Sequence, residues 1–141
     1  MGRRPVLAVT ALGFAVLVLA GCHGIGGPAA DPLDGTSWVI VSLEDKAPLP
    51  GIEVTAVFER GKLHGFSGCN QFGGSYTVNG DRIRISELQS TLMACIAPEG
   101  AMDQEQEFLR LLSASDSYQL TDGQLRLLHS GQVVLAFIPH D

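Results

Sequence analysis

The sequence has little positive charge, few aromatic residues and only three cysteines. Its 141 residues include 9 Lys and Arg against 15 Asp and Glu, a formal net charge of −6. Nucleic-acid-binding proteins carry basic surfaces, so this balance argues against that class. With 45% hydrophobic residues, the chain is apolar enough to fold, and its length fits one domain plus a targeting segment.

Recognisable catalytic motifs are also missing. The chain has no Walker A loop, dinucleotide-binding glycine fingerprint or HExxH zinc motif. Ser67 is not in the Gly-x-Ser-x-Gly turn of hydrolases, because position 69 is Cys. Its odd spacing from His64 predicts that the two side chains point to opposite faces of a strand. The acidic run at residues 103–107 is interpreted as a solvated helix face, since its spacing does not fit a calcium loop. We therefore expect no enzymatic activity, no cofactor and no metal.

One long apolar run is present, at the N-terminus. Two arginines precede an uncharged run over residues 5–20, which is shorter than the roughly 20 residues of a spanning helix. This order is typical of a secretory signal peptide. The run ends in Leu-Ala-Gly-Cys at residues 19–22, which resembles the lipobox of bacterial lipoproteins. The resemblance implies cleavage after residue 21 and attachment of diacylglycerol to Cys22. The alternatives are an ordinary secretory signal with a chance cysteine, or an uncleaved anchor helix.

Cleavage would change the charge of the mature chain. Without Arg3 and Arg4, 7 basic residues face 15 acidic ones, a net charge of −8. An anionic membrane surface would repel such a protein, so the lipid would have to hold it there. Residues 22–34 are rich in Gly, Pro and Ala, which predicts a flexible tether, and residues 35–141 form the predicted domain. We expect the protein in the bacterial cell envelope, outside the cytoplasm, anchored to the membrane by lipid.

Short β-type runs alternate with turn signals from residue 36 onward. In the first run, Trp38, Ile40 and Ser42 are expected to share one face. Asn79-Gly80 is a strong hairpin signal, and turns are also expected at Arg60-Gly61, Asp122-Gly123 and Ser130-Gly131. The pattern predicts strands at residues 36–43, 53–59, 62–66, 74–78, 82–86, 91–96, 117–120, 124–129 and 132–138.

One segment, residues 98–113, has helical rather than strand periodicity. Ala101, Phe108, Leu109 and Leu112 share a stripe, with Leu111 and Met102 at its edge. Pro98 suits the first turn of such a helix. The predicted fold class is therefore α+β: a twisted antiparallel sheet or partly closed barrel of about seven to nine strands, with one packed α-helix.

Cys69 and Cys95 remain once Cys22 carries lipid. An even pair in a secreted domain favours a disulfide. Two buried thiols are a second interpretation. A redox or metal role is a third, although the CxxC redox motif is absent and neither His64 nor His129 has ligand-like spacing to the cysteines.

A set of glycine-rich and aromatic motifs resembles the META domain, also called the HslJ-like family. The motifs are Gly-Thr-Ser-Trp at 35–38, Gly-Phe-Ser-Gly-Cys-Asn at 65–70, Gly-Ser-Tyr at 74–76, Thr-Leu-Met-Ala-Cys at 91–95, the helical segment 105–112 and Leu-Arg-Leu at 125–127. The resemblance spans residues 33–138 in order. It implies a bacterial protein, often of the envelope, linked to heat shock, antibiotic tolerance, secretion or motility, and it carries over no enzymatic activity. The motif glycines, Asn70 and Trp38 resemble determinants of the fold.

These observations favour a non-enzymatic envelope lipoprotein that acts in envelope maintenance or in stress and antibiotic tolerance through protein contacts. Its binding surface is hypothesised at the Gly-rich 65–76 segment, through Gln71 and Phe72, with burial of Phe72 as the alternative. A small apolar-ligand carrier and an inhibitor or accessory module of a larger enzyme are the other hypotheses.

Overall fold

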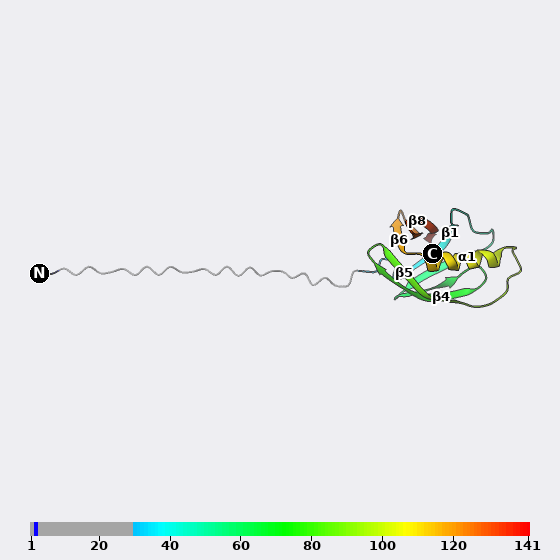
Figure 1. Ribbon diagram of the computed structural model, residues 1–141, viewed down its shortest axis with the longest axis horizontal. Coiled ribbons are helices and arrows are strands. Elements are labelled where there is room, and N and C mark those ends of the chain that lie inside the picture. Colours follow the sequence, from blue (N-terminus) through cyan, green and yellow to red (C-terminus); the bar gives the residue numbers. More distant parts are fainter. Residues whose placement is uncertain (1, 3–29) are drawn as a thin grey trace.

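Eight antiparallel strands close into a barrel, and a single helix packs against it (Figure 1). The computed structural model describes Gly2 and residues 30–141, so the predicted signal peptide and the Cys22 lipobox lie outside the described domain. The elements are β1 (Thr36–Leu43), β2 (Thr55–Glu59), β3 (Lys62–Phe66), β4 (Gln71–Asn79), β5 (Arg82–Ser90), α1 (Ala101–Ala114), β6 (Ser117–Thr121), β7 (Gln124–His129) and β8 (Gln132–Pro139).

The barrel is a simple meander that closes on itself. Each strand pairs with the next in sequence, and β8 returns to pair with β1 from Trp38↔Pro139 to Leu43↔Leu135. The antiparallel barrel and its one helix are as predicted. The closure is complete rather than partial, because the β1–β8 pairing leaves neither strand with a free edge, and the fold is mostly β.

The strand pairing is shortest between β5 and β6, and α1 lies in the chain between these two strands. The two strands share one paired position, Arg82↔Ser117. Helix α1 packs against β5, β7 and β8 and buries Phe108, Leu111 and Leu112. The Phe108 ring meets Phe72 of β4 edge-on, with 5.5 Å between centroids. The helix is therefore joined to the barrel by apolar packing.

The helix differs from its prediction at its first turn. It begins at Ala101, after Gly100 at φ +85°, and not at Pro98, whose peptide bond with Ala97 is cis. Met102 was expected at the edge of the core, but 41% of its surface is exposed. Leu111, also expected at the edge, is buried.

Alternating strand residues fill the barrel interior. Trp38 and Ile40 point inward as predicted, but a bulge between Ile40 and Ser42 turns Leu43 inward in place of Ser42. Phe58 and Tyr76 meet edge-on across the interior at 4.9 Å. The largest fully buried side chains are Tyr76, Phe58, Phe108, Phe137, Leu33, Leu63, Leu111, Leu112, Leu125, Leu127, Leu135 and Val54.

The predicted hairpins form, with one difference in turn residues. Arg60-Gly61, Asp122-Gly123 and Ser130-Gly131 each place both residues at positive φ, as tight hairpins of the I′ type require. At the fourth hairpin Asn79 belongs to β4 and pairs with Arg82, so the two turn residues are Gly80 and Asp81.

Several boundaries differ from the sequence-based expectations, among them the start of β2, which begins at Thr55 and not at residue 53. Strands β4 and β5 are longer than predicted, and residues 91–96 form no strand. The tether was expected to reach residue 34, whereas Leu33 is fully buried and its backbone N–H bonds Asp31. No helix in the described part of the chain has the length and apolar character to cross a membrane.

We predict that Gly65→Ala destabilises the barrel. A Cβ at Gly65 would overlap the Thr55 carbonyl oxygen on β2 and lie 3.1 Å from the Phe72 ring. The backbone would have to move, which costs about 1–3 kcal/mol of unfolding free energy in urea denaturation.

Gly73→Ala is the matched control, because the nearest atom to its Cβ is 3.9 Å away. It should leave stability unchanged or raise it slightly. Equal losses for the two variants would show that the close approach at Gly65 is not the cause.

Candidate functional site

A buried carboxylate joins three parts of the chain at one end of the barrel. Glu105 of α1 is 5% exposed. Its side chain bonds to the turn at residues 67–70, which connects β3 to β4. The same turn also bonds to the segment that follows β5. We call Ser67, Cys69, Asn70 and Glu105 the Glu105 cluster.

Four hydrogen bonds from the turn surround the carboxylate. Oε2 accepts from Ser67 Oγ at 2.6 Å, from the Asn70 backbone N–H at 2.7 Å and from the Cys69 backbone N–H at 3.1 Å. Oε1 accepts from Asn70 Nδ2 at 2.6 Å. The turn can aim these donors at one point because Gly68 takes φ +111°. Such an array of donors is suited to an ionised carboxylate.

The hydrogen bonds decide the charge state of Glu105. Burial opposes ionisation, but the bonds from Ser67, Asn70 and Cys69 outweigh it and lower the pKa of Glu105 below its ordinary value of 4.5. Within residues 30–141, no Lys, Arg or His lies within ion-pair distance of this carboxylate. The negative charge is therefore held by polar donors alone.

Asn70 extends the cluster to the segment after β5. Its Oδ1 accepts from the Met93 backbone N–H at 2.7 Å and from Thr91 Oγ1 at 2.8 Å, and its Nδ2 also donates to the Met93 carbonyl at 3.1 Å. The side chain thus makes all four hydrogen bonds that an amide can make. The Asn70 amide thus occupies the backbone groups that Met93 would use in a strand ladder, and residues 91–96 do not form the predicted strand.

A disulfide closes the same region. Cys69 and Cys95 are bonded, with Cα atoms 5.9 Å apart, so the predicted disulfide is confirmed. The alternatives of two free thiols and of a metal role for these cysteines are excluded by the bond. The Cys95 backbone N–H also lies 3.4 Å from Met102 Sδ of α1. Residues 91–97 are therefore held at both Met93 and Cys95.

The structure corrects two predictions about this region. The acidic run 103–107 is not uniformly solvated, because Glu105 is buried in the cluster while Asp103 is exposed. The expected Gly-rich loop 65–76 is a four-residue turn between two strands. Phe72 lies in β4 with its side chain buried, so it offers no surface for binding, whereas Gln71 is exposed.

The histidines take no part in the cluster. His64 is exposed on β3, opposite Gly73, while Ser67 is fully buried and donates to Glu105. The two side chains point apart, as their spacing predicts. His129 is exposed at the end of β7, with Nδ1 2.8 Å from the Ala114 carbonyl. No group of three or more His, Cys, Asp or Glu in the described residues is arranged to hold a metal ion.

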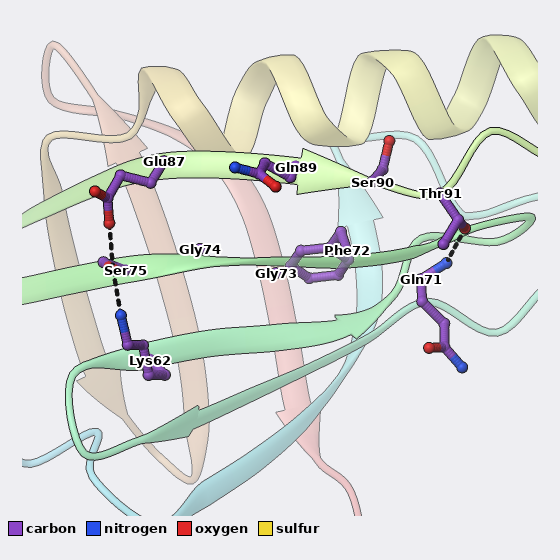
Figure 2. A pocket seen from close by; sticks show the side chains of 10 residues that line it. All are labelled: Lys62, Gln71, Phe72, Gly73, Gly74, Ser75, Glu87, Gln89, Ser90 and Thr91. Carbon is purple, nitrogen blue, oxygen red and sulfur yellow. Dashed lines mark hydrogen bonds between the residues drawn. The ribbon is translucent and has the colours of Figure 1, made fainter.

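An open hollow of about 800 Å³ lies on the outside of β3, β4 and β5. Figure 2 shows Lys62, Ser75 and Glu87 in a row across the three strands, beside the bare backbone of Gly73 and Gly74. Lys62 Nζ donates to Ser75 Oγ at 3.0 Å, and Ser75 Oγ donates to Glu87 Oε2 at 2.7 Å. The row links neighbouring strands at a solvent-exposed face.

A smaller cleft of about 250 Å³ lies between α1 and the loop after β1. Leu43, Ala47 and Leu49 form its apolar walls. Gln104 Oε1 accepts from the Leu49 backbone N–H at 2.6 Å, while its Nε2 is buried without a partner. The cleft could accept only a small molecule, and it lies outside the filled barrel.

Comparison with known proteins identifies the family. Residues 31–141 match the family model of the META domain. The chain belongs to the META domain family. No protein with a curated description matches this sequence.

Solved structures share the fold of this META domain. A protein from Burkholderia xenovorans, solved by NMR, is 26% identical; the match covers 81% of this chain and 93% of that one, with a TM-score of 0.62. A second NMR structure is 21% identical over 76% of this chain and 91% of its own, with a TM-score of 0.61. A DUF4847 family protein from Bacteroides vulgatus, solved by crystallography, is 14% identical. The match covers 78% of this chain and 95% of that one, with a TM-score of 0.57. The last two show similarity of fold alone.

The motif residues of this META domain build the fold. Trp38 Nε1 donates to Thr36 Oγ1 at 2.7 Å within the opening motif. Asn70 bonds both Glu105 and Met93. Sequence reasoning placed Asn70 in a turn but missed Glu105, its main partner. The available signal was that Glu105 lies on one helical stripe with Ala101, Phe108 and Leu112.

We predict that Glu105→Gln lowers the unfolding free energy by about 2–4 kcal/mol at neutral pH, because an amide cannot accept all the donors that face the carboxylate. Since the folded-state pKa is lowered, the stabilisation is present above about pH 4.5 and is lost as the pH falls through the folded pKa. Urea denaturation between pH 7 and pH 3 measures both effects.

Glu107→Gln is the matched control on the same helix. The pKa of Glu107 is also lowered, by its hydrogen bond from exposed Arg110, but an exposed pair contributes little. If the difference between wild type and Glu105→Gln stays constant with pH, the ionised carboxylate is not the source of the stabilisation.

We also predict that the double variant Cys69→Ser, Cys95→Ser is less stable by about 3–4 kcal/mol, because the disulfide closes a long loop in the unfolded chain. Denaturation with and without reductant measures this. The reductant should affect the wild type and leave the double variant unchanged. After alkylation without reductant, peptides containing Cys69 or Cys95 should carry no alkyl group, and alkylation of both would contradict the disulfide.

Proposed function

We propose that this META domain protein is a non-enzymatic, lipid-anchored envelope protein. In this proposal it acts in envelope maintenance or in tolerance of stress and antibiotics, through contacts with other proteins. The Leu-Ala-Gly-Cys sequence at residues 19–22 supports lipid attachment at Cys22. The diacylglycerol on such a cysteine carries two acyl chains, and more than one acyl chain is needed for stable membrane attachment.

The observation that carries the proposal is the Cys69–Cys95 disulfide. Structural disulfides persist in oxidising compartments and are rare in the cytoplasm. Here the bond is combined with the buried Glu105 cluster, since the Cys69 N–H donates to Glu105. A domain that depends on this oxidised turn is suited to work outside the cytoplasm.

The barrel interior is filled with side chains, which supports a function carried out by the surface of the domain. Aromatic and aliphatic side chains from every part of the sheet occupy the interior. The hollow outside β3, β4 and β5 is open and lined largely by polar side chains such as Lys62, Gln71 and Glu87. A small apolar-ligand carrier would therefore have to use the cleft beside Gln104, whose volume of about 250 Å³ is below the range usual for ligand pockets. An inhibitor or accessory module of a larger enzyme would be one form of protein contact.

We predict that Cys22→Ala abolishes lipid attachment. Radiolabelled palmitate should label the wild-type chain and not the variant, and the variant should leave the membrane fraction or accumulate unprocessed. His23→Ala, which changes the neighbouring residue, is the control and should behave like wild type. Unchanged labelling and membrane content in Cys22→Ala would contradict anchoring at this residue.

The same variants test the role in tolerance. Cells that lack the gene should survive envelope-directed antibiotics less well, and wild type and His23→Ala should restore survival where Cys22→Ala does not. Equal restoration by all three would show that anchoring is not needed for the function.

A further inference from the structure

Two aliphatic side chains between β5 and α1 are almost wholly exposed. Leu92 is 96% exposed and Ile96 is 95% exposed, and Met93 in the same segment is 57% exposed. We call residues 91–97 the apolar loop. Single exposed apolar residues are common on protein surfaces, but a cluster in one short segment indicates an interaction site.

The apolar loop is held in place by the buried contacts beneath it. The Asn70 amide bonds both backbone groups of Met93, Thr91 Oγ1 bonds Asn70, and Cys95 is tied to Cys69. A loop fixed in this way loses little conformational freedom when a partner binds, so more of the contact energy is available for affinity. Met102 of α1, with its sulfur near the Cys95 N–H, widens the apolar surface.

The stretch of sequence that contains the apolar loop carries charge of one sign. Residues 85–109 contain five acidic residues and no Lys or Arg. Of these acidic residues, Glu99 and Asp103 are exposed and follow the end of the loop by two and six residues. An anionic lipid surface would repel this region, and so would the same loop of a second copy. A partner with basic residues around an apolar pocket would complement it.

The position of the loop also argues against the anchoring membrane as its partner. The described chain begins at the end of the barrel where Asp31 accepts from Tyr76 Oη at 2.6 Å. The apolar loop, which follows β5, lies on the opposite side of the domain (Figure 1). An anchor at Cys22 would therefore join the domain on the side that lies away from the loop. This step rests on the proposed lipid attachment.

We propose that the apolar loop is the docking surface of this META domain for a protein partner whose apolar pocket is bordered by Lys and Arg. Leu92 and Ile96 enter the pocket, and Glu99 and Asp103 face the basic border. Because the Leu92 and Ile96 side chains are almost wholly exposed, replacing either should reduce binding without changing stability.

Site-specific photo-crosslinking in the native cells tests the proposal. The probe is benzoylphenylalanine at position 96 of the full chain, with the same probe at position 133, an aliphatic site that is 40% exposed on β8, as the control. Position 96 should give one discrete protein adduct that position 133 does not give, and Leu92→Ser in the same chain should remove it.

Binding of the crosslinked protein, once purified, is then measured against the full chain. Ile96→Ser should weaken binding by about tenfold or more, as expected for an apolar anchor in a pocket, and Val133→Ser should not. Binding should also weaken by about tenfold or more between about 0.05 M and about 0.5 M NaCl. The melting temperature of Ile96→Ser should equal that of wild type.

Other outcomes overturn the proposal. These are an adduct with a second copy of the chain, adducts with phospholipid alone, no discrete adduct, or a partner whose binding does not respond to Ile96→Ser or to salt. Crosslinking in the Cys22→Ala background separates this test from the anchoring proposal. Loss of membrane attachment with an unchanged adduct supports docking, whereas attachment that survives Cys22→Ala refutes the anchor and leaves the docking test intact.

Discussion

The ionised Glu105 carboxylate is the interaction on which this end of the barrel depends. Removing such a group from water costs several kcal/mol. The four hydrogen bonds from Ser67, Cys69 and Asn70 contribute about 1.5–3 kcal/mol each when the acceptor is charged. The hydrogen bonds can therefore offset the free-energy cost of burying the charge. They do so only while the turn keeps its geometry. Helix, turn and the segment after β5 are fixed together for this reason.

This arrangement explains how a barrel with one short strand pairing supports a rigid loop. Strands β5 and β6 share one paired position, and the chain between them forms the apolar loop and α1. Phe108 secures the helix through apolar packing, and Glu105, three residues earlier, secures the turn. The disulfide adds a covalent link. The loop is held by buried contacts at its base while its aliphatic side chains remain in water.

Much of the fold could be predicted from the sequence, because strand alternation and X-Gly turns are local signals. The disulfide was also predictable, although only as one of three interpretations. Glu105 was missed because an acidic residue in a run of acidic residues is normally expected to face solvent. Its hydrogen-bond donors also lie more than thirty positions away in sequence. The predicted strand at 91–96 was wrong for a related reason. The backbone groups of Met93, at its centre, bond to the Asn70 side chain, a long-range contact that periodicity does not register.

The most direct test of this account is an NMR titration of the Glu105 carboxyl carbon together with the amide protons of Cys69 and Asn70. The account predicts that Glu105 titrates below its ordinary value of 4.5, and that both amide protons shift with the same midpoint as their acceptor loses its charge. A Glu105 midpoint at or above that value, or amide protons that do not follow it, would contradict the central role of the carboxylate.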